Sequence, residues 1–77
     1  MEICILGPGC PNCRRLERKV IEALAALDLA AEVRKIEKLE EIMDYGVMAT
    51  PALVIDGRVA VKGRVPSTAE LKRLLSA

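Results

Sequence analysis

Two cysteines, Cys10 and Cys13, lie where an apolar segment gives way to a helical pattern, and this placement constrains the fold more than any other feature. Residues 3–6 are continuously apolar, a Gly-Pro-Gly sequence follows, and apolar residues then recur at helical spacing. This order predicts a strand, a tight turn and a helix. Cys10 would lie at the turn and Cys13 in the first helical turn. Two sulfur atoms in those positions can open and close a disulfide bond, so we expect cysteine chemistry here.

Size and composition limit the other classes of function. A chain of 77 residues is expected to form one domain, residues 1–77, with an aliphatic core, because Trp and Phe are absent and Tyr occurs once. The net charge of +1 argues against nucleic acid or an anionic membrane as a partner. The sequence shows neither an apolar run near the ~20 residues of a membrane span nor the pattern of a secretory signal. We therefore expect a cytoplasmic protein.

Strand and helix patterns alternate along the rest of the chain. The continuous apolar run at residues 3–6 is typical of a strand buried on both faces, whereas residues 31–36 alternate as a strand near a sheet edge does. Asp56-Gly57 separates two further strand patterns and predicts a hairpin turn. The elements are expected in the order βαβαββα, with helices over residues 11–27, 38–45 and 67–75 and the hairpin strands over residues 52–55 and 58–61.

The helix ends carry recognisable signals. Pro11 suits a first-turn position, Gly46 is a C-terminal cap, and Ser67 with Glu70 has the spacing of a capping box. Apolar side chains at helical spacing are expected on the inward faces: Leu16, Val20, Leu24 and Leu27, then Leu39, Ile42 and Met43, then Leu71, Leu74 and Leu75. Tyr45 and Met48 are also interpreted as core residues rather than as a cofactor surface.

With this order of elements the chain resembles the thioredoxin superfamily, in particular the glutaredoxin-sized proteins called small redox-active disulfide proteins. The resemblance spans nearly the whole chain. It is carried by the Cys10-Pro11-Asn12-Cys13 motif, the Thr50-Pro51 pair and the Asp56-Gly57 turn. It implies a minimal thioredoxin-like α/β fold, with a four-stranded mixed sheet in the order 2-1-3-4, three helices and a cis peptide bond before Pro51.

The resemblance implies a thiol–disulfide oxidoreductase that works without a bound cofactor. Cys10 would be the nucleophile, because a helix N-terminus stabilises a thiolate, and Cys13 would resolve the mixed disulfide. The expected partners are protein disulfide substrates and a reductant, either a thioredoxin-reductase-like enzyme or glutathione. The protein is expected to be a monomer.

Substrate contacts are expected around the two cysteines. Pro11 and Asn12 lie between them in the sequence, and the resemblance places Thr50 and Pro51 beside Cys10. The backbone of Thr50 would then pair with an extended substrate segment. An apolar surface around Gly9, Val47 and Met48 is a candidate docking face for protein substrates. The alternative for Pro51 is an ordinary proline at the start of a strand.

The chain departs from its apparent relatives in three places. Asn12 stands where glutaredoxins often carry Tyr, and residues 62–64 do not clearly match their glutathione-binding residues. Cys4 occupies the position of the buried acid of thioredoxins; we interpret it as a small apolar core residue, with a reserve disulfide partner as the alternative.

Arg14 and Arg15, in the first helical turn, are either partners of a nearby anion or a solvated charged face.

Other roles for the cysteine pair stay open at this point. Soft thiolates suit Cu(I), so a small copper chaperone is the main alternative. Such chaperones end in a strand, whereas this chain is predicted to end in a helix. A zinc site lacks ligands, because three cysteines and no histidine cannot supply four within one chain. A redox-inert interaction module is the third possibility. No metal site is therefore expected.

Overall fold

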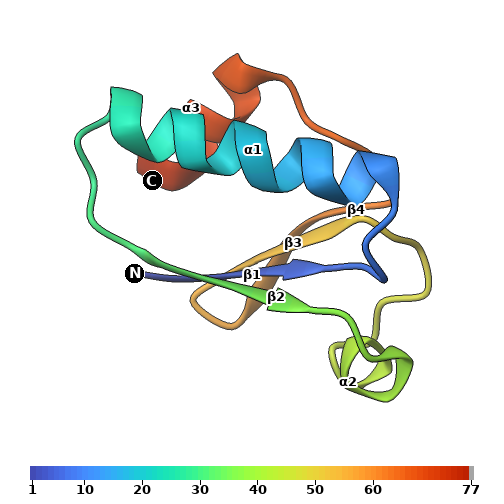
Figure 1. Cartoon of the computed structure of the whole chain (residues 1–77). Coiled ribbons are helices and arrows are strands. Elements are labelled where there is room, and N and C mark those ends of the chain that lie inside the picture. The colour runs from blue at the N-terminus through green and yellow to red at the C-terminus, as the bar shows by residue number, and fades with distance from the viewer. Residues whose placement is uncertain (77) are drawn as a thin grey trace.

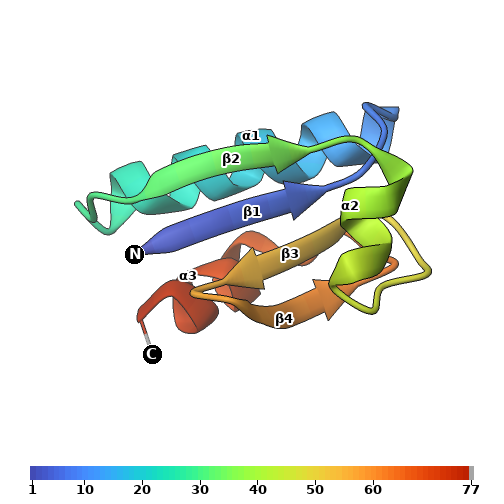
Figure 2. The same ribbon diagram turned by 90° about the horizontal axis from the view of Figure 1, so that it is seen from below.

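The computed structural model describes residues 1–76 and contains one four-stranded sheet and three helices (Figure 1). In chain order the elements are β1 (Glu2–Leu6), α1 (Pro11–Ala26), β2 (Glu32–Ile36), α2 (Leu39–Asp44), β3 (Ala52–Ile55), β4 (Arg58–Lys62) and α3 (Thr68–Ser76). The strands lie in the order β2-β1-β3-β4, with β1 parallel to β2 and the other neighbours antiparallel (Figure 2). The predicted α/β class, element order and mixed sheet are confirmed.

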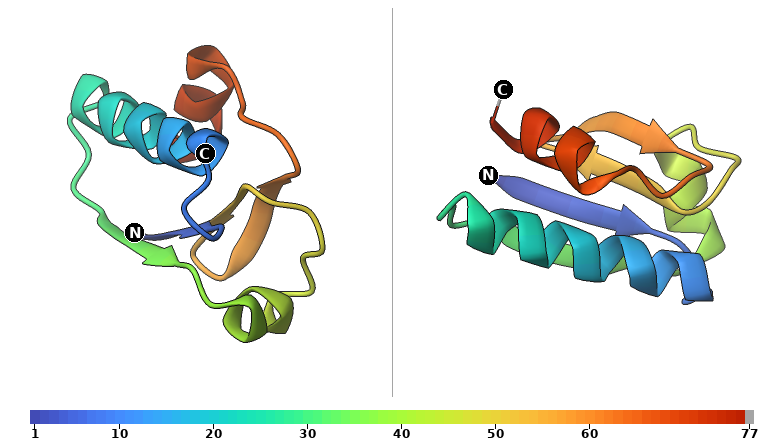
Figure 3. Two further views of the ribbon diagram at one scale, coloured as in Figure 1. Left: turned by 45° about the vertical axis from the view of Figure 1, so that its right-hand side comes forward. Right: turned by 90° about the horizontal axis from the view of Figure 1, so that it is seen from above.

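The sheet separates two layers of unequal size. Helices α1 and α3 pack side by side on one face, whereas α2 lies on the other face, at the end of the sheet where β1 runs into α1 (Figure 3). Strand β1 is buried on both faces, as its apolar run predicts. Ile3 and Ile5 contribute to the core beneath α1 and α3, and Cys4 and Leu6 to the core beneath α2.

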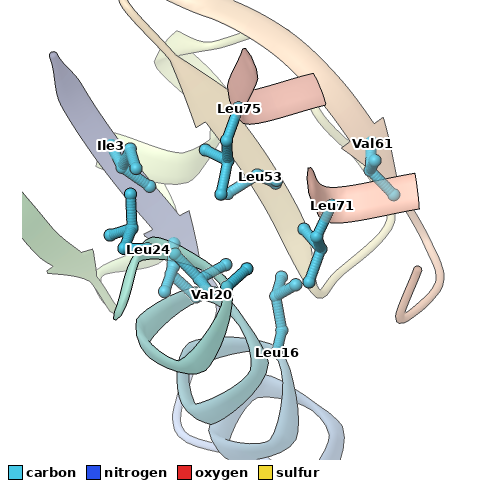
Figure 4. Packing of buried hydrophobic residues seen from close by; sticks show 10 residues of the cluster. Ile3, Leu16, Val20, Leu24, Leu53, Val61, Leu71 and Leu75 are labelled. Atoms are coloured by element: carbon cyan, nitrogen blue, oxygen red, sulfur yellow. The ribbon is translucent and has the colours of Figure 1, made fainter. Parts of the chain in front are cut away.

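The core on the α1 and α3 side is the larger of the two. Side chains from α1, α3, β1, β3 and β4 meet there (Figure 4). Its buried residues are Ile3, Ile5, Leu16, Val20, Ala23, Leu24, Leu53, Val61, Leu71 and Leu75. All are aliphatic, as a chain without Trp or Phe requires. Leu27 and Leu74, predicted to face inward, are partly buried at its margin.

The prediction that Leu39, Met43 and Met48 belong to the core is wrong. Their exposed fractions are 67%, 56% and 93%. Helix α2 has only six residues, less than two turns, so a single side chain, Ile42, faces the sheet. Met48 follows the helix on an open loop. Tyr45 is partly buried, as expected of a residue at the edge of this second core.

Most local signals have the predicted geometry. Pro11 is the first residue of α1, Gly46 has a φ of +74°, and Asp56 and Gly57 have φ values of +49° and +83°, as in a two-residue hairpin turn. The capping box at α3 is only half formed. The Glu70 N–H donates to Ser67 Oγ (3.1 Å), but the Glu70 carboxylate accepts two hydrogen bonds from Arg64 instead of returning to Ser67.

Candidate active site

Cys10 and Cys13 are joined by a disulfide at the N-terminus of α1, with their Cα atoms 5.0 Å apart. Cys10 is the N-cap residue, and its backbone is extended. The Cys13 N–H donates to Cys10 Sγ at 3.2 Å, so the outer sulfur already accepts a hydrogen bond from the first helical turn. Cys10 is half-buried, whereas Cys13 is only 5% exposed. Cys10 is therefore the more accessible of the two cysteines.

The charges around the first turn of α1 favour an anion at Cys10. This turn contains no Asp or Glu that would compete for the free N–H groups. Its two cations, Arg14 and Arg15, are exposed, and the Arg14 guanidinium donates to the Gly9 carbonyl at 3.1 Å. That hydrogen bond links the first turn of α1 to the residue just before Cys10. A helix N-terminus without acidic side chains in its first turn favours a thiolate at the N-cap position.

Gly7, which the sequence analysis did not single out, provides the space for Cys13. A Cβ atom at Gly7 would overlap Cys13 Sγ and would lie 3.2 Å from Cys13 Cβ and 3.9 Å from Thr50 Cβ. The backbone of Gly7 also continues the sheet, since its N–H donates to the Ile36 carbonyl at 2.9 Å. The backbone just after β1 thus approaches both the buried sulfur and the Thr50 loop. This role of Gly7 is visible only in the tertiary structure, where atoms of Gly7, Cys13 and Thr50 approach one another.

The Thr50–Pro51 peptide bond is cis, and its loop lies next to Gly7 and Cys13. Pro51 is buried and Thr50 is exposed. The Gly63 N–H donates to the Pro51 carbonyl at 2.9 Å, and a Cβ at Gly63 would stand 3.2 Å from Ala49 Cβ. The segment after β4 therefore supports the proline loop. Gly63 is a second positioning residue that no local signal predicts.

The remaining sequence-predicted residues divide between the site and the core. Pro11 and Asn12 are exposed in the first turn of α1, beside the disulfide. Val47, predicted to lie on a docking face, is buried in the second core but also lines the apolar groove near the site. The exposed apolar side chains of that groove are Leu39, Met43 and Met48. The groove has a volume of about 340 Å³, and its wall also includes Pro8 and Thr50.

Cys4 packs on the α2 face of the sheet rather than with the disulfide pair. Its thiol is buried, and the Tyr45 hydroxyl donates a hydrogen bond to its sulfur at 3.8 Å. This hydrogen bond, together with the charge interaction with Cys4 and partial burial, raises the pKa of Tyr45 above its ordinary value. Cys4 shares its surroundings with Leu6 and Val54, among other apolar side chains. These contacts agree with the interpretation of Cys4 as a core residue.

Within residues 1–76, three or more His, Cys, Asp or Glu side chains never gather closely enough to hold a metal ion. None of the helices described here combines the length and the apolar character that crossing a membrane would need.

The fold and the site together define a thioredoxin-like protein, with a disulfide at the start of the helix after β1 and a cis-proline loop beside it. The chain belongs to the thioredoxin family, since the model of the thioredoxin domain matches residues 1–76. It is 42% identical to a thioredoxin of Methanothermobacter thermautotrophicus over 99% of each chain. It is 34% identical to a thioredoxin of Methanocaldococcus jannaschii, covering 95% of this chain and 84% of that relative.

A probable thioredoxin of Archaeoglobus fulgidus is also 34% identical, over 90% of this chain and 78% of its own length. With the Cys10–Cys13 pair in place, membership of this family makes the protein a thiol–disulfide oxidoreductase. Members of the family exchange disulfides with protein substrates and are served by a reductase. The copper-chaperone alternative is not favoured, because the chain has α2 between β2 and β3 and ends in α3.

Proposed function

We propose that Cys10 is the nucleophile and Cys13 the resolving thiol of this oxidoreductase. The Cys10 thiolate attacks a substrate disulfide, forms a mixed disulfide and releases one substrate thiolate. Cys13 then attacks Cys10 Sγ, which closes the Cys10–Cys13 disulfide and releases the second thiolate, so two electrons pass to the substrate. The observation that carries this assignment is the difference in access: Cys10 is half-buried at the helix N-terminus and Cys13 is buried one turn later.

Substrate segments are proposed to bind across the exposed residues around the disulfide. Thr50, ahead of buried Pro51, offers its backbone to an extended chain, in the manner of an added strand. Pro11 and Asn12, the exposed residues between the two cysteines, are proposed to contact the substrate as well. The docking face consists of Leu39, Met43 and Met48, whose groove reaches Pro8 and Thr50. Apolar side chains flanking the substrate cysteine would be buried there.

The proposed setting is a single domain, residues 1–77, that acts as a cytoplasmic monomer without a bound cofactor. Cysteine usage supports this location, because two of the three cysteines form a close pair rather than a framework of structural bridges. The specific substrates are disulfides in other proteins. The reductant that regenerates the dithiol is proposed to be a thioredoxin-reductase-like enzyme or glutathione.

Reduction of insulin by dithiothreitol tests the two cysteine roles. Cys10→Ser is expected to abolish catalysis, whereas Cys13→Ser should retain the first attack and accumulate a mixed disulfide that mass spectrometry detects. Cys4→Ser is the matched control, since Cys4 lies in the second core, and it should keep nearly full activity. Equal activity of wild type and Cys10→Ser would end the assignment.

Equilibration of the Cys10–Cys13 pair with glutathione buffers separates the two candidate reductants. A difference of about 30 mV changes the equilibrium by about 1.4 kcal/mol for this two-electron couple. A potential well below that of the glutathione pool would point to a thioredoxin-reductase-like donor. A potential near that of the pool would point to glutathione.

A further inference from the structure

A second cavity, of about 380 Å³, reaches Cys13 between the first turns of α1 and the end of β2. Its wall includes four charged side chains, which are Arg14, Glu17, Lys35 and Glu37. This cavity adjoins the apolar groove over α2, because Pro8 and Glu37 line both. Cys13, the buried cysteine of the pair, therefore lines a polar cavity to which the proposed reaction has so far given no role.

Glu17 is held at the wall of this cavity by two elements. It lies four residues after Cys13 on α1, so the two side chains project from the same side of the helix, one turn apart. Lys35 is paired with Ile5 in the β1–β2 register and therefore points to the same face of the sheet, toward α1. Its Nζ lies 3.8 Å from Glu17 Oε2, and the Glu17 side chain is 27% exposed. The carboxylate is thus partly enclosed beside Cys13.

The resolving step requires a proton acceptor for Cys13. A thiol attacks a disulfide only as the thiolate, and at 5% exposure Cys13 has little direct access to bulk water. The groups that line this cavity with it are Arg14 and Glu17 from α1, Lys35 from β2 and Glu37 just after β2. Of these, only the two carboxylates can accept a proton near neutral pH. Glu37 Oε2 lies against the turn before Cys10, 3.3 Å from the position of a Cβ at Gly9.

We propose that Glu17 is the general base for Cys13 and that Lys35 is the residue that positions it, an inference that rests on the assignment of Cys13 as the resolving thiol. A water molecule in the polar cavity passes the Cys13 proton to the Glu17 carboxylate. The Cys13 thiolate then attacks Cys10 Sγ, the bond between Cys10 and the substrate sulfur breaks, and the substrate leaves as a thiolate. The proton moves from Glu17 to solvent or to that thiolate. When a reductant opens the disulfide, the same path returns a proton to Cys13.

Stopped-flow reaction of the reduced protein with dithiobis(nitrobenzoate) separates the two steps. Attack by Cys10 releases a first coloured thiolate, and resolution by Cys13 releases a second. Every variant is also prepared with Cys4→Ser, so that both releases belong to the Cys10–Cys13 pair. Glu17→Gln is expected to leave the first release unchanged and to slow the second at least about tenfold near neutral pH, within the range of general-base effects. The difference should vanish well above the ordinary thiol pKa of about 8.5, where hydroxide removes the proton.

Whether Glu17→Gln slows or speeds the second release shows whether Glu17 acts as a base or only as a nearby negative charge. Removal of a negative charge near Cys13 favours its thiolate and would speed the second release if Glu17 acted only through its field. Glu37→Gln is the matched control and should change neither release, whereas Glu17→Asp, which keeps a carboxylate in the cavity, should recover part of the rate. An unchanged or faster second release in Glu17→Gln, or an equal slowing in Glu37→Gln, overturns the inference. A wild-type protein that gives no second release instead overturns the assignment of Cys13.

Discussion

The two faces of the sheet differ in how completely they are covered. On one face, α1 and α3 enclose a core of ten buried aliphatic residues. On the other, the six-residue α2 covers only one end, and it contributes one buried side chain, Ile42. Leu39, Met43 and Met48 are left in contact with solvent on this thinner side. Helix α1 begins, and α2 lies, at the same end of the sheet, on opposite faces of it (Figure 1).

This difference suggests a division of roles within one small domain. A chain of this size buries only about 60% of the surface of its unfolded form, so few apolar residues can be left exposed without loss of stability. The three most exposed of them, Leu39, Met43 and Met48, line one groove whose wall also includes Pro8 and Thr50. The α1 and α3 face would then supply most of the stability, and the α2 face would supply the contact surface for substrates.

The largest expected effect is on the covered face. Leu16→Ala removes a side chain with no exposed surface from the centre of the α1 and α3 core. It should lower the free energy of unfolding by about 3–4 kcal/mol, because two helices and the sheet hold the cavity open. Urea denaturation of the oxidised protein measures this change. A loss below about 1 kcal/mol would mean that this core is not the main source of stability.

The equivalent truncation on the thin face should have a smaller effect. Ile42→Ala is expected to destabilise by about 2 kcal/mol, at the low end for such substitutions, because α2 can settle toward the sheet and partly fill the space. Leu39→Ala, on the same helix but exposed, is the control and should change stability by less than about 0.5 kcal/mol. If Ile42→Ala proved as damaging as Leu16→Ala, the two faces would be equivalent in stability.

A surface substitution on the thin face should affect function more than stability. Met48→Ser should leave the free energy of unfolding within about 0.5 kcal/mol of wild type. It should raise the KM for a protein substrate about fivefold, which corresponds to about 1 kcal/mol of lost apolar contact. Ile21→Ser is the control; Ile21 is an exposed apolar residue on α1, outside the groove, and its substitution should leave KM unchanged. An equal rise in KM for both variants would contradict the docking face.

The smallest expected effect is electrostatic and lies at the start of α3. Hydrogen bonds from Arg64 lower the pKa of the Glu70 carboxyl. A carboxyl with a lowered folded-state pKa stabilises the protein above its unfolded-state pKa, and this contribution disappears as the pH falls through the folded-state value. Wild type should therefore be slightly more stable than Glu70→Gln near neutral pH and equal to it in acid. Denaturation at several pH values measures the difference; a gap that widened in acid would contradict the sign.

Much of the fold followed from local patterns in the chain. The apolar run before Cys10, the helical spacing after it and the Asp56-Gly57 turn each fix a conformation through neighbouring residues, and each appears as predicted. The cysteine pair could be located in the same way, because its place between a strand and a helix is a local property. By contrast, the register shift of the β3–β4 pair at Leu53 and Val54 has no local signal, since it depends on how two strands twist together.

Errors arose where burial depends on partners distant in the sequence. The periodicity of α2 gave three inward residues, but only contact with the sheet decides that Ile42 is covered and that Met43 is not. Glu70 had the right spacing to complete the capping box of α3, yet its carboxylate accepts hydrogen bonds from Arg64 instead. Val47 was assigned to a docking face and does line the groove there, but the sequence did not show that its side chain is almost fully covered.

The amino-acid sequence by itself determined the strands and helices, their order and the position of the two reactive sulfurs, because these depend on dihedral preferences and on spacing over a few residues. Tertiary structure alone decided that Gly7 must lack a side chain and that Glu17, Lys35 and Cys13 line one cavity. The physical reason is that burial, close approach and charge pairing join segments far apart in the chain. Such contacts exist only once the sheet and its two layers have formed.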